Sequence, residues 1–256
     1  MVRNYFFIMV LLSFFGHEGS VYAQFGPIMS PNLAPQARSE QELDTYIGII
    51  QASSPQETVH QVEAFEHAYP QSALLGIAYQ YQMLAYRDLN DFGQTIRSGE
   101  KALKLNPDNL NTLLTLAAVL PNSVSGDQAE KSRLAQAENY VQLAFQGMEK
   151  IKLPRTVSPD HWELLRRQLQ ASAHESLGFV AIKRGDSSKA VTEFEKAVKL
   201  NPTPQGSQYY RLGAAYLFAN KKDAAIDFLQ RATELGPKKV QIMAQELLRK
   251  IGKKKK

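Results

Sequence analysis

Two stretches of the chain, Leu177–Pro202 (LGFVAIKRGDSSKAVTEFEKAVKLNP) and Leu212–Pro237 (LGAAYLFANKKDAAIDFLQRATELGP), follow one pattern at an offset of 35 positions. Neither stretch contains histidine, cysteine or a glycine-rich loop, so the repeated sequence pattern indicates a structural role rather than a catalytic one. The paired marks are Gly178 and Gly213, Ala181 and Tyr216, Gly185 and Asn220, Ala190 and Ala225, Phe194 and Leu229, Ala197 and Ala232, and Pro202 and Pro237.

Small residues at matching places predict a close contact between two helices in each stretch. We expect Gly178 and Gly213 where the first helix lies closest to the second, with Ala190 and Ala225 as their small partners. Larger side chains at these positions would push the two helix axes apart.

Turn and stop residues delimit the two helices. Gly185 and Asn220 both enter the left-handed conformation at little cost, which suits the end of the first helix. Pro202 and Pro237 end the second helix because proline cannot continue a hydrogen-bonded helix. Each stretch is therefore predicted to form a helix–turn–helix unit.

This pattern resembles the tetratricopeptide repeat (TPR), a helix–turn–helix unit of about 34 residues that ends in proline. The resemblance is strong over residues 171–237 and looser over 71–145. It implies an all-α fold: a right-handed superhelical solenoid of helical hairpins with a C-terminal capping helix. The composition agrees, because 256 residues with 44% hydrophobic content can bury a sizeable core.

The earlier repeat departs from the family pattern in its packing residues. Asn90 keeps the turn mark, but Met83 and Thr95 replace the small pair and Gly99 stands where an aromatic residue is usual. In the next unit, Pro121–Gln128 makes the region between the two helices about eight residues longer than the 34-residue repeat allows.

The domain organisation follows from these marks and from the helix start at Ser158-Pro159-Asp160, which begins an unusually long helix running to Lys183. Gln241–Arg249 is expected to be the capping helix. The predicted segments are 1–23, a signal peptide; 24–38, a proline-rich flexible lead-in; 39–150, N-terminal TPR-like hairpins; 151–170, a linker or insertion and the start of a long helix; 171–237, two well-matched repeats; and 238–256, the capping helix with a lysine-rich tail.

The N-terminus has the pattern of a secretory signal. Arg3 precedes an apolar run from Tyr5 to Phe15, and small residues at Val21 and Ala23 mark a cleavage site after Ala23. The run is shorter than the roughly 20 residues of a membrane-spanning helix, although a retained anchor stays as the alternative. Cysteine is absent, which removes disulfides and a lipid-attachment site. We expect an exported protein, periplasmic or secreted, with no transmembrane segment after cleavage.

The basic charge is confined to one end of the chain. The net charge of +5 and the pI near 9.2 depend on residues 249–256 (RKIGKKKK), which contribute six positive charges. The remaining body is close to neutral, so the composition does not favour nucleic-acid binding. Lys253–Lys256 could instead contact an anionic surface.

The TPR resemblance implies a partner-binding groove lined by the first helices of the hairpins. The chaperone-tail binders of this family carry lysine and asparagine there to clamp a carboxylate, whereas this chain has Glu175 and Phe179, then Tyr210 and Ala214, which disfavours that ligand. Packing between hairpins is the competing interpretation for each apolar position. The candidate groove residues are Leu84, Leu114, Phe179, Tyr210, Leu217 and Phe218.

Catalytic signals are weak. His60, Glu63 and His67 could share a helix face and form a metal site, but three polar residues on an exposed face are ordinary solvation. The sequence contains no nucleophile elbow, Walker loop or dinucleotide fingerprint. We therefore predict no enzyme activity, no catalytic residue, no cofactor and no metal.

Two classes of function remain open. The first is a protein-protein interaction scaffold or adaptor of the bacterial periplasm or cell envelope, which binds a segment of a partner protein in the concave TPR groove. The alternative is an envelope-surface protein that docks through its basic C-terminal tail. Salt separates the two, because tail docking weakens as salt rises and apolar binding hardly changes.

Overall fold

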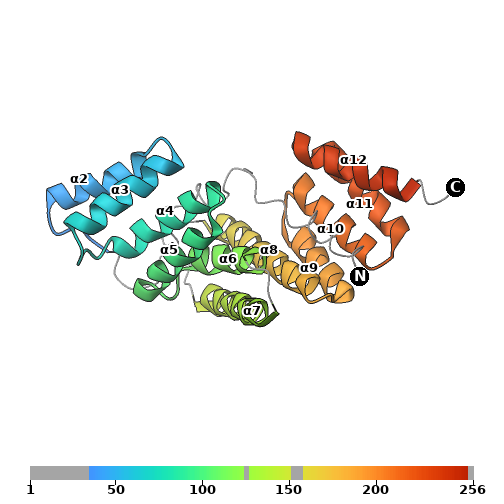
Figure 1. Ribbon diagram of the computed structural model, residues 1–256, viewed down its shortest axis with the longest axis horizontal. Coiled ribbons are helices and arrows are strands. Elements are labelled where there is room, and N and C mark those ends of the chain that lie inside the picture. The colour runs from blue at the N-terminus through green and yellow to red at the C-terminus, as the bar shows by residue number, and fades with distance from the viewer. Residues whose placement is uncertain (1–34, 124–126, 151–157, 253–256) are drawn as a thin grey trace. The chain divides into compact units, whose positions relative to one another are not determined.

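The computed structural model describes residues 35–123, 127–150 and 158–252, and every regular element in these ranges is a helix (Figure 1). The elements are α2 (Glu40–Gln51), α3 (Pro55–Ala68), α4 (Leu75–Asp88), α5 (Phe92–Leu105), α6 (Leu110–Val119), the short 3-10 helix η2 (Leu120–Asn122), α7 (Asp127–Lys150), α8 (Pro159–Lys183), α9 (Ser187–Leu200), α10 (Gly206–Phe218), α11 (Lys222–Leu235) and α12 (Lys238–Gly252). The predicted signal segment and the Lys253–Lys256 tail lie outside the described residues.

The helices form hairpins that group into two compact units. The N-terminal unit contains the hairpins α2–α3, α4–α5 and α6–α7, and the C-terminal unit contains α8–α9, α10–α11 and α12. Each unit buries its own apolar core, and the C-terminal core runs continuously from α8 to α12. The all-α class of the prediction is confirmed. Among the described residues, no helix combines the length and apolar character needed to cross a membrane.

Polar caps start many of the helices where the sequence places serine or aspartate. Ser39 and Ser54 accept hydrogen bonds from the backbone N–H groups of Glu42 and Glu57, and both glutamates reach back to the residue before the cap. Ser158 caps α8 in the same way, so the long helix predicted from this point to Lys183 is present. Each cap satisfies N–H groups that the first helical turn leaves without partners.

The predicted turn residues adopt the expected conformation. Gly185 and Asn220 follow the first helices of the two C-terminal hairpins with φ values of 77° and 59°. Asn90 follows α4, the first helix of its hairpin, and also has a positive φ, of 60°. Glycine and asparagine tolerate this left-handed region better than other residues, so the turn prediction is confirmed at all three hairpins.

The glycine contacts differ from the prediction in one respect. A Cβ atom on Gly178 would lie 2.7 Å from the Phe194 ring, and one on Gly213 would lie 2.8 Å from Leu229 Cγ. The nearest neighbours are thus the large residues Phe194 and Leu229 of the second helix, whereas the sequence pattern pointed to Ala190 and Ala225, which are fully buried. In each hairpin the glycine leaves room for Phe194 or Leu229 to lie directly against the first helix, and this large side chain fills the space between the two helices.

The unusual residues of the second hairpin fit together by the same principle. A Cβ atom on Gly99 would meet Leu116 at 2.6 Å and the Met83 sulfur at 2.9 Å. Met83 and Leu116 of α6 therefore fill the space that an aromatic side chain at position 99 would occupy. The capping helix α12 begins at Lys238, three residues before the predicted Gln241, directly after Pro237.

Candidate functional site: an apolar groove and a polar cluster on the first helices

An apolar groove of about 660 Å³ lies in the N-terminal unit, where the segment before α2 passes the starts of α2 and α4. Tyr46, Leu74 and Ile77 form its buried wall, and each is less than a tenth exposed. Leu43, at the edge, is 44% exposed. The lining residues are Pro35, Gln36, Ala37, Arg38, Ser39, Glu40, Leu43, Tyr46, Leu74 and Ile77.

An exposed apolar stripe on α2 extends beyond this groove. Leu43, Ile47 and Ile50 follow a spacing of four and three residues, which places them on one side of the helix. Leu43 and Ile50 are 44% and 51% exposed, and Ile47 is half-buried. The stripe lies beside the buried Tyr46 and Ile49 face rather than opposite to it. The first hairpin therefore presents more apolar surface than its own core uses.

Tyr46, which forms part of the groove wall, belongs to the buried apolar core of the N-terminal unit. Burial, and to a lesser extent the nearby Tyr81, raises the pKa of the Tyr46 hydroxyl to about 12. The Tyr46 ring packs on Phe65 of α3 with a centroid distance of 6.0 Å. A hydroxyl with a pKa this high stays neutral at physiological pH, so the groove carries no negative charge from this residue.

The repeat pattern did not point to this groove. The repeat pattern is weakest in the first hairpin, so the repeat register predicts groove residues only in the hairpins downstream. The 4–3 spacing of Leu43, Ile47 and Ile50 is a signal that could have found the stripe. Nothing in the local sequence could have shown that Leu74 and Ile77 would line the groove together with Tyr46.

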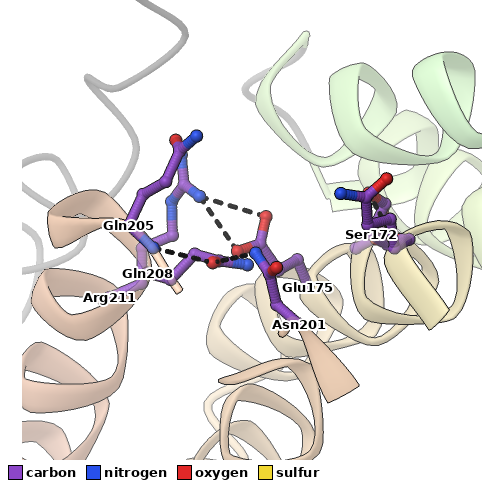
Figure 2. Close-up of polar contacts among 8 residues, drawn as sticks. Ser172, Glu175, Asn201, Gln205, Gln208 and Arg211 are labelled. Atoms are coloured by element: carbon purple, nitrogen blue, oxygen red, sulfur yellow. Dashed lines mark hydrogen bonds and ion pairs between the residues drawn. The ribbon is translucent and has the colours of Figure 1, made fainter. Parts of the chain in front are cut away.

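In the C-terminal unit, a half-buried ion pair joins the first helices of the two hairpins. Arg211 Nη1 lies 3.1 and 3.0 Å from the two carboxylate oxygens of Glu175, as Figure 2 shows. The Arg211 guanidinium also lies over the Phe179 ring, 5.5 Å from its centroid. The side chains of Arg211 and Glu175 are only 14% and 18% exposed, so solvent screens this pair less than a surface pair.

Amide side chains hold the loop between these hairpins next to the ion pair (Figure 2). Gln208 Oε1 accepts hydrogen bonds from Asn201 Nδ2 at 2.6 Å and from the Gln205 backbone N–H at 3.2 Å. Asn201 Oδ1 accepts a further bond from the Thr203 backbone N–H at 3.1 Å. The connection from α9 to α10 is thus fixed by polar contacts, which position Arg211 three residues after Gln208.

The six predicted groove residues do not share one environment. Leu114, Phe179 and Tyr210 are buried, at 2%, 3% and 1% exposure. Leu84, Leu217 and Phe218 are half-buried and keep some accessible surface. The expectation that all six line an open face is therefore wrong for the first three, because neighbouring helices cover them. Partner contact by any of the six stays a prediction.

The burial of Phe179 and Tyr210 has an identifiable cause. The Phe179 ring meets Phe194 edge-on, with centroids 5.4 Å apart, inside the α8–α9 hairpin. Tyr210 belongs to the same core. Burial is the main cause that raises the pKa of its hydroxyl, and the nearby negative charge of Glu246 adds to the effect. Replacing Tyr210 by alanine would therefore open a cavity and destabilise the unit, not merely remove a contact surface.

Histidines do not assemble a metal site in the described ranges. His60, Glu63 and His67 lie on the exposed side of α3, and no group of three or more metal-ligating side chains occurs among the residues that the structure describes. His174 instead places Nδ1 2.6 Å from the carboxylate of Glu193 on α9. This histidine links the two helices of its hairpin.

Comparison with known proteins supports the repeat assignment. The family model described as tetratricopeptide repeat matches residues 171–204 and 209–239. The first match covers the second half of α8 with α9, and the second covers most of α10 with α11. A comparison with curated proteins gave no significant match.

Solved structures extend the likeness over most of the chain. A thermophilic TPR protein, TTC0263 of Thermus thermophilus, is 17% identical with a TM-score of 0.58, covering 81% of this chain and 98% of that one. Residues 41 to the end of MamA from Desulfovibrio magneticus RS-1 are 16% identical with a TM-score of 0.55, covering 78% and 97%. These likenesses confirm the predicted TPR-like solenoid class. At such identities they carry no information about the partner.

Proposed function

We propose that the protein is a non-enzymatic interaction scaffold whose first helices bind an apolar segment of a partner protein. The single observation that carries the proposal is the groove at α2 and α4, where Leu43 is 44% exposed beside a buried apolar wall. The apolar stripe on α2 continues beyond the groove to Ile50, which is 51% exposed. TPR units present such surfaces for protein recognition, which is the general activity that the fold supports.

The groove suits an apolar side chain more than a charged one. Its wall is aromatic and aliphatic, and the charged groups Arg38 and Glu40 lie at its rim with opposite signs. A buried apolar anchor contributes through the area that it removes from water, at roughly 25 cal/mol per Å². Binding should therefore depend little on salt, since the rim charges are exposed and nearly balanced.

Export to the periplasm or cell envelope is part of the proposal. It is supported by the positive start, the apolar run Tyr5–Phe15 and the small residues before Gln24. The partner would then be a protein of the same compartment, met during envelope assembly, transport or secretion.

A cross-linking pull-down from native envelope fractions tests the proposal. The double variant Leu43→Gln and Ile50→Gln should lose at least tenfold in partner capture, because it removes two apolar contacts of roughly 1 kcal/mol or more each. The matched control is Leu105→Gln with Leu235→Gln, two leucines of similar exposure that are not among the residues lining the groove. Circular dichroism should show the same helicity for both double variants. Equal capture by the two would refute the groove as the binding site.

A further inference from the structure

The first hairpin and the last helix carry charge of opposite sign. Residues 39–69, which include α2 and α3, contain six Asp or Glu and no Lys or Arg, for a net charge of −6. Residues 238–252, which form α12, contain four Lys or Arg and one Glu, for a net charge of +3. Residues 70–237, between them, contain 20 basic and 17 acidic residues and are close to balance. The charge imbalance therefore lies in the first hairpin and in α12.

The packing of α12 directs its basic residues outward. The buried face of the helix consists of Val240, Ala244, Leu247 and Ile251, which are at most 7% exposed and pack into the C-terminal core. Lys238, Ile242 and Arg249 lie on the opposite face, because they fall midway between the buried positions around the helix. All three are exposed, and Ile242 keeps 54% of its surface. We call these three residues the basic face.

One ion pair lies beside the basic face. Lys250 Nζ is 2.8 Å from a carboxylate oxygen of Glu246, and this hydrogen bond together with the charges of Lys250 and Arg249 lowers the pKa of Glu246. Glu246 therefore stays ionised and offsets the charge of Lys250. Lys238, Lys239 and Arg249 account for the remaining positive charge of the helix.

One side of α2 provides a surface of the opposite charge. Glu40, Asp44, Ile47 and Ile50 follow a spacing of four, three and three residues, which places them along one side of the helix. Glu40 and Asp44 are exposed, Ile50 is 51% exposed and Ile47 is half-buried. We call these four residues the acidic stripe. Glu40 is the one member of the stripe that also lines the groove described above.

The two surfaces match in length and in the order of their residues. Glu40 to Ile50 covers about 15 Å and Lys238 to Arg249 about 16 Å, at 1.5 Å per residue. With the two helices parallel, Lys238 would lie beside the carboxylates of the stripe and Ile242 beside its isoleucines. Arg249 would then lie at the C-terminal end of α2, whose last turn contains no basic residue to offset the partial negative charge of its carbonyl groups.

We propose that the basic face of one copy of the chain docks on the acidic stripe of a second copy. Opposite charges orient the encounter, and the exposed isoleucines leave water on contact. The contact joins two different surfaces, so each docked copy leaves one of its own surfaces open and the association continues into rings or open chains. A contact between two helices is smaller than the roughly 1,200 Å² of stable interfaces, so it should be weak and depend on protein concentration.

Sedimentation velocity over a range of protein concentrations tests this inference on the full chain. The average mass should rise with concentration, and the rise should diminish as salt is added. Lys238→Glu with Arg249→Glu should weaken self-association by about tenfold, because like charges would then face each other across the contact. Glu40→Lys with Asp44→Lys should have the same effect from the other side. An average mass that does not change with concentration would overturn the proposal.

Mixing the two double variants separates a lost contact from a damaged fold. Neither variant should associate alone, but equal parts of both should associate again, since the two reversed surfaces complement each other and so do the two unchanged ones. Circular dichroism should show unchanged helicity for each variant. Failure of the mixture to associate would overturn the pairing of these surfaces.

The matched control reverses the same number of charges elsewhere in the C-terminal unit. Lys199→Glu with Lys222→Glu alters two exposed lysines of α9 and α11 and should change self-association by about twofold or less. A loss equal to that of Lys238→Glu with Arg249→Glu would show that only the net charge matters, and would overturn the basic face as a docking surface.

This inference goes beyond the proposed function and can fail separately from it. Lys238→Glu with Arg249→Glu alters α12 in the C-terminal unit, so partner capture by the groove in the N-terminal unit should be unchanged. Partner capture without self-association would remove this inference and leave the scaffold proposal in place. Self-association without partner capture would remove the scaffold proposal alone.

Discussion

At the scale of single residues, two glycines allow the last hairpin to close. A Cβ atom on Gly206, the first residue of α10, would lie 2.2 Å from both the Cα and the backbone N of Gly236. Gly236 ends α11, and a Cβ there would meet the Ala232 carbonyl oxygen at 2.6 Å. The start of α10 and the junction of α11 with α12 therefore touch backbone to backbone. Side-chain rotation cannot relieve such a contact.

Replacing Gly206 by alanine should destabilise the C-terminal unit by about 3 kcal/mol, the upper end of the overpacking range, since the obstructing atoms are backbone. Thermal or urea unfolding followed by circular dichroism measures the change. The control is Gly252→Ala in the same unit, where the new Cβ has no neighbour within 4 Å and the free energy of unfolding should change by less than about 1 kcal/mol. Equal shifts for the two variants would contradict the contact.

Tyr46 should make the N-terminal unit sensitive to alkaline pH. Its folded pKa is about 12 against an ordinary value of 10.0, so the folded state retains the proton that the unfolded state releases. The stabilisation is fully present below pH 10 and is lost as pH rises through 12, by up to about 2–3 kcal/mol. Tyr46→Phe keeps the ring and should flatten this part of the stability profile. Profiles of the same slope for both proteins would refute the assignment.

At the scale of elements, neighbouring hairpins of the C-terminal unit are linked by polar and aromatic contacts as well as by apolar burial. Arg211 connects α10 to Glu175 of α8 and also covers the Phe179 ring. On another face, Phe228 of α11 stacks between Tyr209 and Tyr216 of α10, with centroid distances of 6.3 and 5.5 Å. Directional contacts of these kinds restrict how one helix slides past the next.

Glu175→Gln should destabilise the C-terminal unit by about 1–3 kcal/mol, because it leaves the half-buried Arg211 charge without its carboxylate. The matched control is Glu163→Gln on the same helix, whose pair with Arg166 is 41% and 52% exposed and should contribute less than about 0.5 kcal/mol. Chemical denaturation of both variants decides the matter. A double variant with Arg211→Met should recover part of the loss, and no recovery would argue against direct coupling.

At the scale of the whole molecule, the chain distributes its features unevenly along its length. The apolar groove lies at α2 and α4, whereas residues 238–256 contain eight Lys or Arg and one Glu. The residues before Gln24 have the composition of an export signal.

Expression in a host with a secretory pathway should yield a precursor and a mature form that lacks residues 1–23. We expect the short apolar run to direct export without anchoring the chain, and cleavage to follow the small residue Ala23. Intact-mass measurement of the exported protein distinguishes the two forms. Recovery of a full-length chain from the membrane fraction alone would favour a retained anchor.

The sequence by itself determined the local features of the fold. Gly185 and Asn220 mark turns that the structure contains, and Pro202 and Pro237 mark helix ends. These signals are reliable because they act within a few residues, through backbone conformation and lost hydrogen bonds. The 35-residue offset then identified the repeat, since the same local solution occurs twice.

Only the tertiary structure decided which surfaces stay open. The register placed Phe179 and Tyr210 on first helices, yet neighbouring helices of the C-terminal core cover them, while Leu43 keeps 44% of its surface. Likewise, the contact of Gly206 with Gly236 joins residues 30 positions apart, and no local pattern distinguishes it from an ordinary turn glycine. Burial depends on which helix packs against a given face, and helical periodicity specifies the face but not its neighbour.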